Sequence, residues 1–138
     1  YAGGIDTVRG VVGSRYVAPA LGTRAMTGLA DDWWNLWLRL AGPDLSPQPA
    51  HTITALDRAA TWTAANRIIY HGPEIFAVTF DPRYGLVTGV YFDATRGVNV
   101  RFDGVLLQDQ GLVTGAYRTP GPGGPASPVS GLFSAEPR

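Results

Sequence analysis

The chain contains no cysteine and no lysine, and each absence removes a class of chemistry. Without cysteine there can be no disulfide, no thiolate nucleophile and no cysteine-ligated zinc or iron–sulfur site. All 11 basic residues are arginines, whose guanidinium groups stay protonated in proteins. A lysine general base and a lysine Schiff base are therefore excluded as well.

Charge and long apolar runs are also scarce. Charged residues make up 16% of the chain, and the 11 basic residues are balanced by 11 acidic ones. A protein that binds nucleic acid needs a surplus of positive charge against phosphate, so we expect no nucleic-acid partner. The same balance argues against a polybasic membrane-surface module. No apolar run approaches the roughly 18 residues of a membrane-spanning helix, so we expect no transmembrane segment.

Glycine and proline are abundant, at 18 and 11 of 138 residues. They separate short apolar runs, which is typical of an all-β chain with tight turns. The hydrophobic fraction of 45% is enough for one domain with a real core. We predict an all-β fold, an antiparallel sandwich or barrel of about eight to ten short strands, with a hairpin meander in the C-terminal half.

Alternating apolar positions locate the expected strands. They lie at residues 7–12, 14–17, 33–40, 51–56, 75–80, 86–92, 98–107 and 112–118. In the strand at 33–40, Trp34 falls on the same face as Leu36, Leu38 and Leu40, and Trp33 and Trp37 fall on the other. Residues 57–66 fit either a short helix or the start of a strand over 61–70, and both alternatives stay open.

The pentapeptide GLVTG occurs twice, at residues 85–89 and 111–115. In each copy we expect the first glycine to close a turn. The second lies inside a strand, where glycine is unfavourable unless it permits a bulge or close packing. The leucine and threonine fall on one face and the valine on the other. Because the repeat lacks charge and metal ligands, we interpret it as one hairpin design used twice rather than as a binding loop.

The second half of the chain also carries a longer order of turn and core residues. A turn-closing glycine precedes L-x-T-G and an aromatic, and F-x-G-V-x-L-Q and a closing Gly–aromatic strand follow. The matching residues are Gly85, Leu86, Thr88, Gly89, Phe102, Gly104, Val105, Leu107, Gln108, Gly115 and Tyr117. Residues 51–119 thereby resemble a β-rich module of large secreted bacterial surface proteins, including autotransporter-like and repeat-rich proteins of planctomycete and verrucomicrobial type. The resemblance implies an extracellular or cell-surface location and a structural role, and it brings no catalytic residue.

Candidate catalytic and metal-binding residues are few. His51 and His71 are the only histidines, and their spacing matches no zinc or iron motif. Asp31 and Asp32 are adjacent, and on a strand they would point to opposite faces, so we interpret them as turn or strand-edge charges. We expect no catalytic residue, no metal site and no cofactor. The sequence favours a non-enzymatic protein and leaves open an enzyme that has no strong motif.

Aromatic residues are the strongest candidates for binding. We single out Trp33, Trp37, Tyr84 and Tyr91 as ligand-binding or interface residues. Sugars stack on aromatic faces beside polar partners, and protein interfaces are rich in Trp, Tyr and Arg. Our leading hypothesis is a non-enzymatic structural module of a secreted or cell-surface bacterial protein, a subunit of an extracellular filament or layer whose partners are its own copies or a larger surface protein. The alternatives are a carbohydrate-binding β-sandwich with a glycan partner, and a small-ligand β-barrel with or without enzymatic activity.

The two ends of the chain carry separate expectations. We expect one β domain over residues 1–119, followed by a Pro/Gly-rich strap at 120–138 with a last short strand at 130–134. Proline cannot donate to a sheet ladder, so we expect residues 120–128 outside the sheet. At least one terminus, residues 2–12 or the tail, is expected to pack against another copy. The alternative, in which both ends lie along their own domain, stays open. Because the chain begins at Tyr1 and not at methionine, we expect a processed or excised chain.

Overall fold

The computed structural model describes residues 13–42, 56–94, 96–121 and 124–138. These residues form eight antiparallel strands and one short 3₁₀ helix, η1 (Gln108–Gln110). The strands are β1 (Leu36–Ala41), β2 (Leu56–Trp62), β3 (Ile68–Tyr70), β4 (Phe76–Asp81), β5 (Leu86–Asp93), β6 (Val98–Leu107), β7 (Leu112–Gly121) and β8 (Gly124–Pro137). The predicted all-β fold is confirmed.

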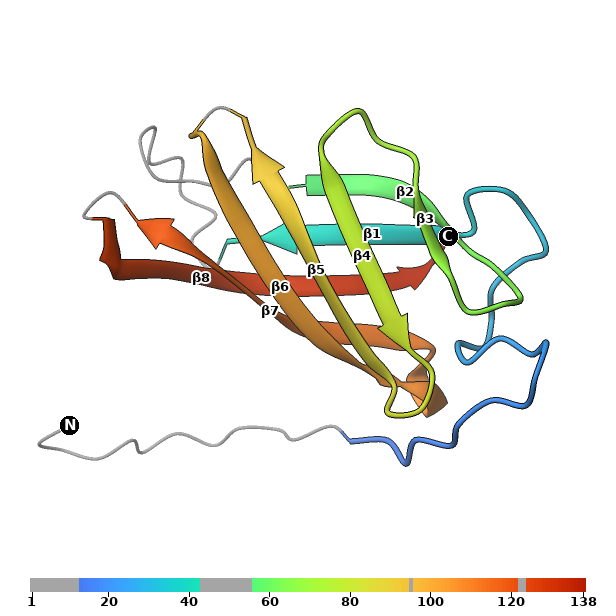
Figure 1. Cartoon of the computed structure of the whole chain (residues 1–138). Helices are drawn as coiled ribbons and strands as arrows, with labels where there is room; N and C mark the ends of the chain where they lie inside the picture. The colour runs from blue at the N-terminus through green and yellow to red at the C-terminus, as the bar shows by residue number, and fades with distance from the viewer. Residues whose placement is uncertain (1–12, 43–55, 95, 122–123) are drawn as a thin grey trace, which may run out of the picture.

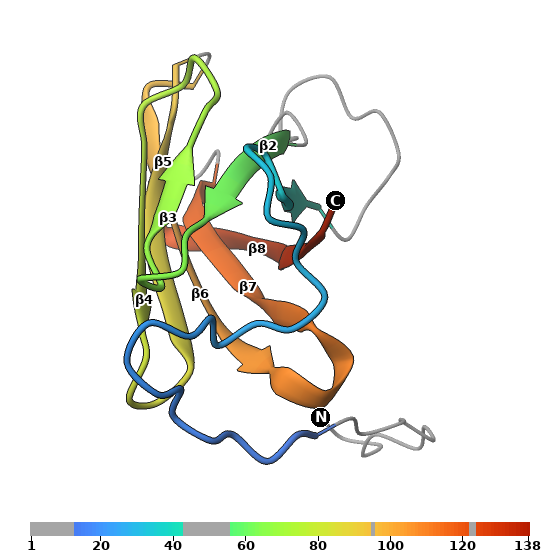
Figure 2. The ribbon, with the colours of Figure 1, turned by 90° about the vertical axis from the view of Figure 1, so that its right-hand side faces the viewer.

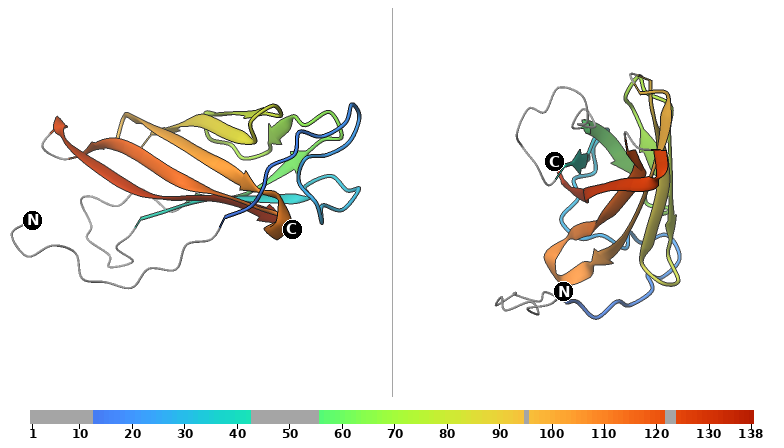
Figure 3. Two further views of the ribbon diagram at one scale, coloured as in Figure 1. Left: turned by 90° about the horizontal axis from the view of Figure 1, so that it is seen from below. Right: turned by 90° about the vertical axis from the view of Figure 1, so that its left-hand side faces the viewer.

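The eight strands form one sheet that curls into a nearly closed barrel (Figure 1). Their order is β3-β2-β1-β8-β7-β6-β5-β4, so each strand lies beside its neighbour in the sequence and β1 meets β8. The two end strands, β3 and β4, lie beside each other without a hydrogen-bonded ladder among the described residues. Figures 2 and 3 show the curvature from the side and from below. The architecture is therefore a barrel, and the predicted meander covers β4 to β8.

Side chains of alternate residues fill the barrel, as expected when about eight strands close on themselves. In β1 the three leucines at 36, 38 and 40 point inward, which confirms their predicted face. Ring contacts continue the core from strand to strand: Trp62 packs on Phe80 at 4.6 Å between centroids, and Phe102 packs on Phe133 at 4.5 Å. Burying a large apolar side chain stabilises a fold by about 1.5 to 3 kcal/mol, so this interior holds the barrel together.

The GLVTG repeat serves architecture. Its first glycines, Gly85 and Gly111, close the turns that precede β5 and β7 and adopt left-handed φ values of 70° and 59°. The valines, Val87 and Val113, are fully buried inside the barrel. The predicted turn positions and face assignment are both confirmed.

The second glycine of each copy lies where two strands or a strand and a ring approach closely. A Cβ at Gly89 would stand 2.2 Å from the Phe102 ring, and a Cβ at Gly115 would stand 1.9 Å from the carbonyl oxygen of Asp103. No larger residue fits either position without displacing its neighbours. The repeat therefore marks two equivalent strands that flank β6, and both need a glycine against it.

The segment before β1 closes one end of the barrel (Figure 2). Residues 14–17, predicted as a strand, form none. The side chain of Gln108 takes the role of a strand partner there: its Oε1 accepts from the Val17 amide at 2.8 Å and its Nε2 donates to the Val17 carbonyl at 2.9 Å. Further along, Met26 is buried against the core. The predicted strand at 7–12 and the first five residues of that at 51–56 lie outside the described residues.

The open choice at residues 57–66 resolves into a strand and a turn. β2 ends at Trp62, and Asn66 takes a left-handed φ of 56° before β3 begins. The Asn66 side chain fixes this turn by accepting from the Ala25 amide at 2.7 Å and from Trp62 Nε1 at 3.0 Å. Neither the helix nor the continuous strand over 61–70 is present.

The tail is not a strap. Residues 124–137 form β8, the longest strand, which lies between β1 and β7 and includes the predicted strand at 130–134. The expectation that residues 120–128 lie outside the sheet is wrong, because Pro120 pairs with Pro128 across β7 and β8. The Pro120 carbonyl accepts from Arg96 and so points away from β8, which means that the missing Pro120 N–H would not have joined that ladder. The tail lies along its own domain, whereas residues 2–12 fall outside the described part.

Candidate functional site

An aromatic cluster covers the outer face of β1 and β2. Because the β1 leucines point inward, Trp37 points outward and pairs in register with Ala59 of β2. Thr61 also faces outward, yet it is buried, because it lies beneath the side chains that precede β1 and follow β3. The outer face of β1 and β2 thus supports the aromatic side chains that pack on it.

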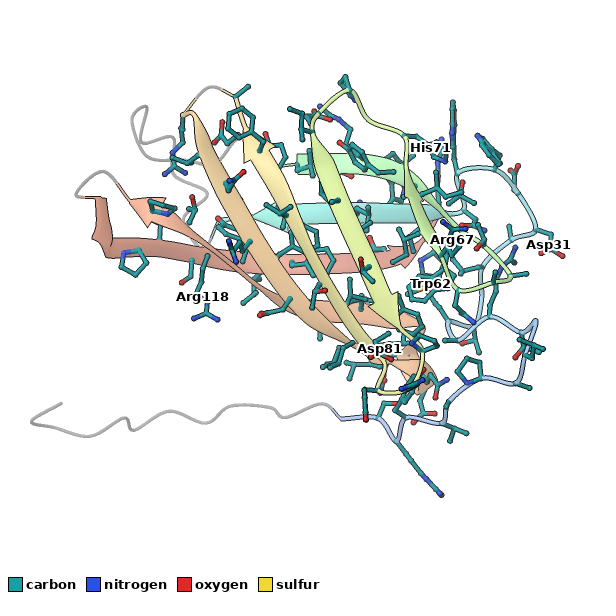
Figure 4. The ribbon with its side chains drawn as sticks, viewed as in Figure 1. Asp31, Trp62, Arg67, His71, Asp81 and Arg118 are labelled. Carbon is teal, nitrogen blue, oxygen red and sulfur yellow. The ribbon has the colours of Figure 1, made fainter. Side chains whose placement is uncertain are left out.

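Trp34 sits above this face in an unusual backbone conformation. Its φ is 74°, a left-handed value that costs a bulky residue about 1 to 3 kcal/mol. The Trp34 amide donates to Thr61 Oγ1 at 3.0 Å, and the same oxygen lies 2.7 Å from His71 Nε2. The His71 ring lies 5.2 Å from that of Trp33 and 6.1 Å from that of Trp34. One buried hydroxyl therefore fixes both the strained tryptophan and the histidine (Figure 4 labels His71).

These side chains border an open groove of about 390 Å³, which we call the tryptophan groove. It is lined by Trp34, Trp37, Asp57, Arg58, Ala59, His71, Gly72, Pro73 and Arg138. Its aromatic walls remain accessible, since Trp34 is 47% exposed and the neighbouring Trp33 is 63% exposed.

Charged groups stand at fixed places around the tryptophan groove. The Arg138 guanidinium lies 5.0 Å from the centroid of Trp37 and 5.8 Å from that of Trp34, within cation–π range of both. The Arg138 amide donates to the Asn35 carbonyl at 3.0 Å, which anchors this residue. The Asp57 carboxylate forms an ion pair with Arg39, which does not line the groove, at 3.3 Å between Oδ2 and Nε. The groove therefore offers both donors and acceptors beside its indole rings.

A second polar cluster joins the tryptophan groove to the β3–β4 gap. Arg58 donates to Glu74 at 2.6 Å, and the hydroxyl of Tyr70 donates to the same carboxylate. Burial alone would raise the pKa of Glu74, but the hydrogen bonds from Tyr70 and Arg58 outweigh it and lower that pKa below its usual value. Burial, and then the bond to Glu74, raise the pKa of the Tyr70 hydroxyl. The cluster thus keeps Arg58 in place at one wall of the groove.

The four residues proposed from the sequence do not share one site. Trp33 and Trp37 both belong to the cluster around the tryptophan groove. Tyr84 is 68% exposed in the turn between β4 and β5. Tyr91 is 6% exposed inside the barrel, where burial raises the pKa of its hydroxyl. Only the two tryptophans therefore remain candidates for one binding surface.

Sequence reasoning missed Trp34, His71 and Arg138 as members of this surface. The alternation grouped Trp34 with the inward leucines, and that placement is wrong because β1 begins only at Leu36. His71 was considered only as a metal ligand, and its place beside the indoles follows from the β2–β3 register. The outward phase of Trp37 was the one signal that pointed to this face.

The remaining polar candidates have structural contacts. Asp31 forms an ion pair with Arg24 at 2.7 Å, and Asp32 accepts from the Trp33 amide at 2.6 Å, as expected of turn residues. Within the described ranges, no three His, Cys, Asp or Glu residues gather as a metal site would require. His51 lies outside those ranges. The described residues also include no helix that is long and apolar enough to cross a membrane.

Comparisons with other proteins add no assignment. No protein-family model, no curated protein and no solved structure matches this chain.

Proposed function

We propose that the chain is a non-enzymatic binding module and that the tryptophan groove holds a sugar ring. The observation that carries the proposal is the strained, exposed Trp34, held by Thr61 at the edge of an open groove. Backbone strain at an exposed aromatic residue lowers stability without serving the core, and such strain gathers at ligand-binding sites. The groove volume of about 390 Å³ is in the range of small-ligand pockets.

The mixture of groups also suits a sugar. The C–H faces of a pyranose pack on indole rings, and its hydroxyls need both donors and acceptors close by. The two indoles supply the first requirement. Asp57, His71 and Arg138 supply the second, and each already has at least one partner that limits its motion.

The first experiment is a glycan array followed by affinity measurements on variants. We expect Trp37→Ala to weaken binding at least about fivefold, because stacking on an aromatic face contributes about 1 to 3 kcal/mol in comparable contacts. Tyr84→Ala is the control, since it removes an exposed aromatic ring from the β4–β5 turn, which does not line the tryptophan groove. Equal effects of the two substitutions, or a wild-type chain that binds no glycan, would contradict the proposal.

A second candidate function is assembly with other copies in an extracellular filament or layer. The observation that favours it is the gap between β3 and β4, whose facing edges have no ladder with any strand of the described residues and lie beside the exposed Ile69 and Ile75. A strand from a neighbouring copy can add to such an edge. The resemblance to secreted surface modules supports the same proposal and a location outside the cell.

Sedimentation at rising protein concentration tests the assembly candidate. Ile75 is 74% exposed, so Ile75→Arg should block strand addition there without disturbing the core. We expect oligomers of the wild-type chain that this variant does not form. A wild-type chain that stays monomeric at every concentration would exclude assembly through this edge and would leave sugar binding untouched.

A further inference from the structure

Two neighbouring strands of the barrel part from each other on the side away from the tryptophan groove. The β6–β7 ladder ends at the pair Arg101 and Arg118. Beyond that pair β6 follows β5 as far as Val98, whereas β7 follows β8 as far as Gly121. Figure 1 shows the two strands diverging. The divergence opens a groove of about 480 Å³, which we call the β6–β7 wedge; its polar lining comes from Asn99, Arg101, Arg118 and Thr119, and its apolar lining from Val98 and two prolines.

Two arginines stand opposite each other at the closed end of the wedge. Arg101 and Arg118 are cross-strand partners, so their Cβ atoms lie about 5 Å apart. Both side chains are exposed on the outer face, and Figure 4 shows Arg118 projecting away from the strands. Neither forms an ion pair with any residue in the described part of the chain. Like charges directly opposite each other destabilise a sheet, so this pair of guanidinium groups lowers stability.

A third arginine lies beside the same gap. Arg96, from the turn between β5 and β6, donates through Nη2 to the Pro120 carbonyl of β7. It thereby bridges the two strands where their own ladder has ended. Its amide donates to Asp93 Oδ1 at 3.2 Å, which places a carboxylate at the inner side of this turn.

Two buried polar atoms beside the wedge have no hydrogen-bond partner among the described residues. They are Nη1 of Arg96 and Oγ1 of Thr119. A buried donor that stays unsatisfied costs about 1 to 3 kcal/mol, and such atoms are rare in folded proteins. Thr119 lies on the inward face of β7 with Tyr117, whereas Arg118 lies on the outward face. The two buried atoms therefore mark the inner side of this region, and the facing arginines alone present their charge to the outer groove.

We propose that the β6–β7 wedge binds an oxyanion, a carboxylate or sulfate group carried on a saccharide, between Arg101 and Arg118. Guanidinium groups grip carboxylates and sulfates through paired hydrogen bonds, and two of them can hold one group from both sides. The volume exceeds what a free inorganic ion fills, and Val98 and the prolines give an apolar wall for the body of the ligand. The wedge shares no residue with the tryptophan groove, so either site can fail without the other.

The test is calorimetric titration of the full chain with three oligosaccharides of equal length. Oligogalacturonate carries carboxylates, a dextran sulfate oligosaccharide carries sulfates, and unmodified dextran carries no charge. We expect binding of at least one charged oligosaccharide, weakening as salt screens the charges, and no binding of dextran. The stronger of the two charged probes identifies the group that the wedge prefers.

Matched variants locate the binding. Arg118→Gln and Arg101→Gln should each weaken binding at least tenfold. Arg83→Gln is the control, because it removes the same charge from an exposed position in the β4–β5 turn. We expect a change of less than about twofold for this variant, since an exposed charge so far away is largely screened. The proposal is overturned if neither charged oligosaccharide binds, if dextran binds as well as they do, or if Arg83→Gln weakens binding as much as Arg118→Gln.

Discussion

Replacement of Gly115 by alanine tests whether the repeated pentapeptide is an architectural device. The new Cβ would lie 1.9 Å from the Asp103 carbonyl oxygen and 2.4 Å from the Gly104 Cα, against an ordinary separation of about 3.5 to 4.0 Å. Both contacts are with backbone atoms of β6, so no side-chain rotation relieves them. The β6–β7 ladder must shift instead, across the register pair Gly104 and Gly115.

The expected cost follows from two opposing terms. Overpacking of this kind destabilises by about 1 to 3 kcal/mol, whereas alanine restricts the unfolded chain and returns about 0.4 to 1 kcal/mol. We expect the free energy of unfolding to fall by about 2 kcal/mol. The overpacking cost should lie near the upper end of its range, because the backbone atoms of β6 cannot move aside as a side chain can. The unfolding entropy of a chain of 138 residues is about 0.3 kcal/mol per degree, so the melting temperature should fall by about 7 °C.

Thermal unfolding followed by circular dichroism measures this loss. Gly13→Ala is the control, because Gly13 has no atom within 4 Å of a Cβ and no left-handed φ. Its melting temperature should stay within about 2 °C of the wild type, since surface substitutions rarely exceed 0.5 kcal/mol. If Gly115→Ala also stays within that range, the close approach of β6 and β7 does not explain the second glycine of the repeat.

Two further predictions concern polar contacts. Asn66→Ala should lower the free energy of unfolding, measured in urea, by about 2 to 3 kcal/mol, because Trp62 Nε1 and the Ala25 amide lose their shared acceptor. Asn99 is exposed, so Asn99→Ala should have little effect and serves as the control. Equal losses for the two variants would refute this role of Asn66. Glu74 has a folded pKa below the ordinary 4.5, so its contacts stabilise above the unfolded pKa and are lost as pH falls through the folded pKa. Glu74→Gln should therefore flatten the fall in melting temperature on acidification, and an unchanged slope would contradict the assignment.

The sequence predicted the strands of the C-terminal half well because glycine and proline bound them closely. β6 has the predicted limits, Val98–Leu107, and the turns that precede β5 and β7 close at glycines as expected. The all-β class followed from the same alternation. The ring order of strands did not, because the β1–β8 pairing joins residues about one hundred positions apart and no local pattern encodes it.

The failures have physical reasons in particular side chains. Residues 14–17 alternate like a strand, but Gln108 satisfies their backbone in place of a neighbouring strand. Pro120 and Pro128 were expected to keep their segment out of the sheet. They pair with each other across β7 and β8, at a place where β7 extends beyond its ladder with β6. Pro120 therefore occupies a part of β7 that has no ladder with β6 among the described residues, as its missing N–H allows.

The candidate site was only half predictable. The outward phase of Trp37 followed from the leucine alternation, and Trp33 was expected on the same face. The approach of His71 and Arg138 depends on the β2–β3 and β1–β8 registers, which bring distant residues together. Tyr91 shows the opposite error: an aromatic residue that suited a binding surface lies inside the barrel, in phase with Val87.

The most direct test of the sugar-binding proposal uses the four indole N–H signals in a two-dimensional nitrogen–proton spectrum. Three of the tryptophans lie in the exposed cluster, and Trp62 is buried in the core as an internal reference. The chain would be titrated separately with cello-, xylo-, manno- and chito-oligosaccharides. We predict that at least one of them shifts the Trp34 and Trp37 signals in a saturable way and leaves the Trp62 signal in place. The proposal is contradicted if none of the four moves these signals, or if Trp62 shifts as much as Trp37.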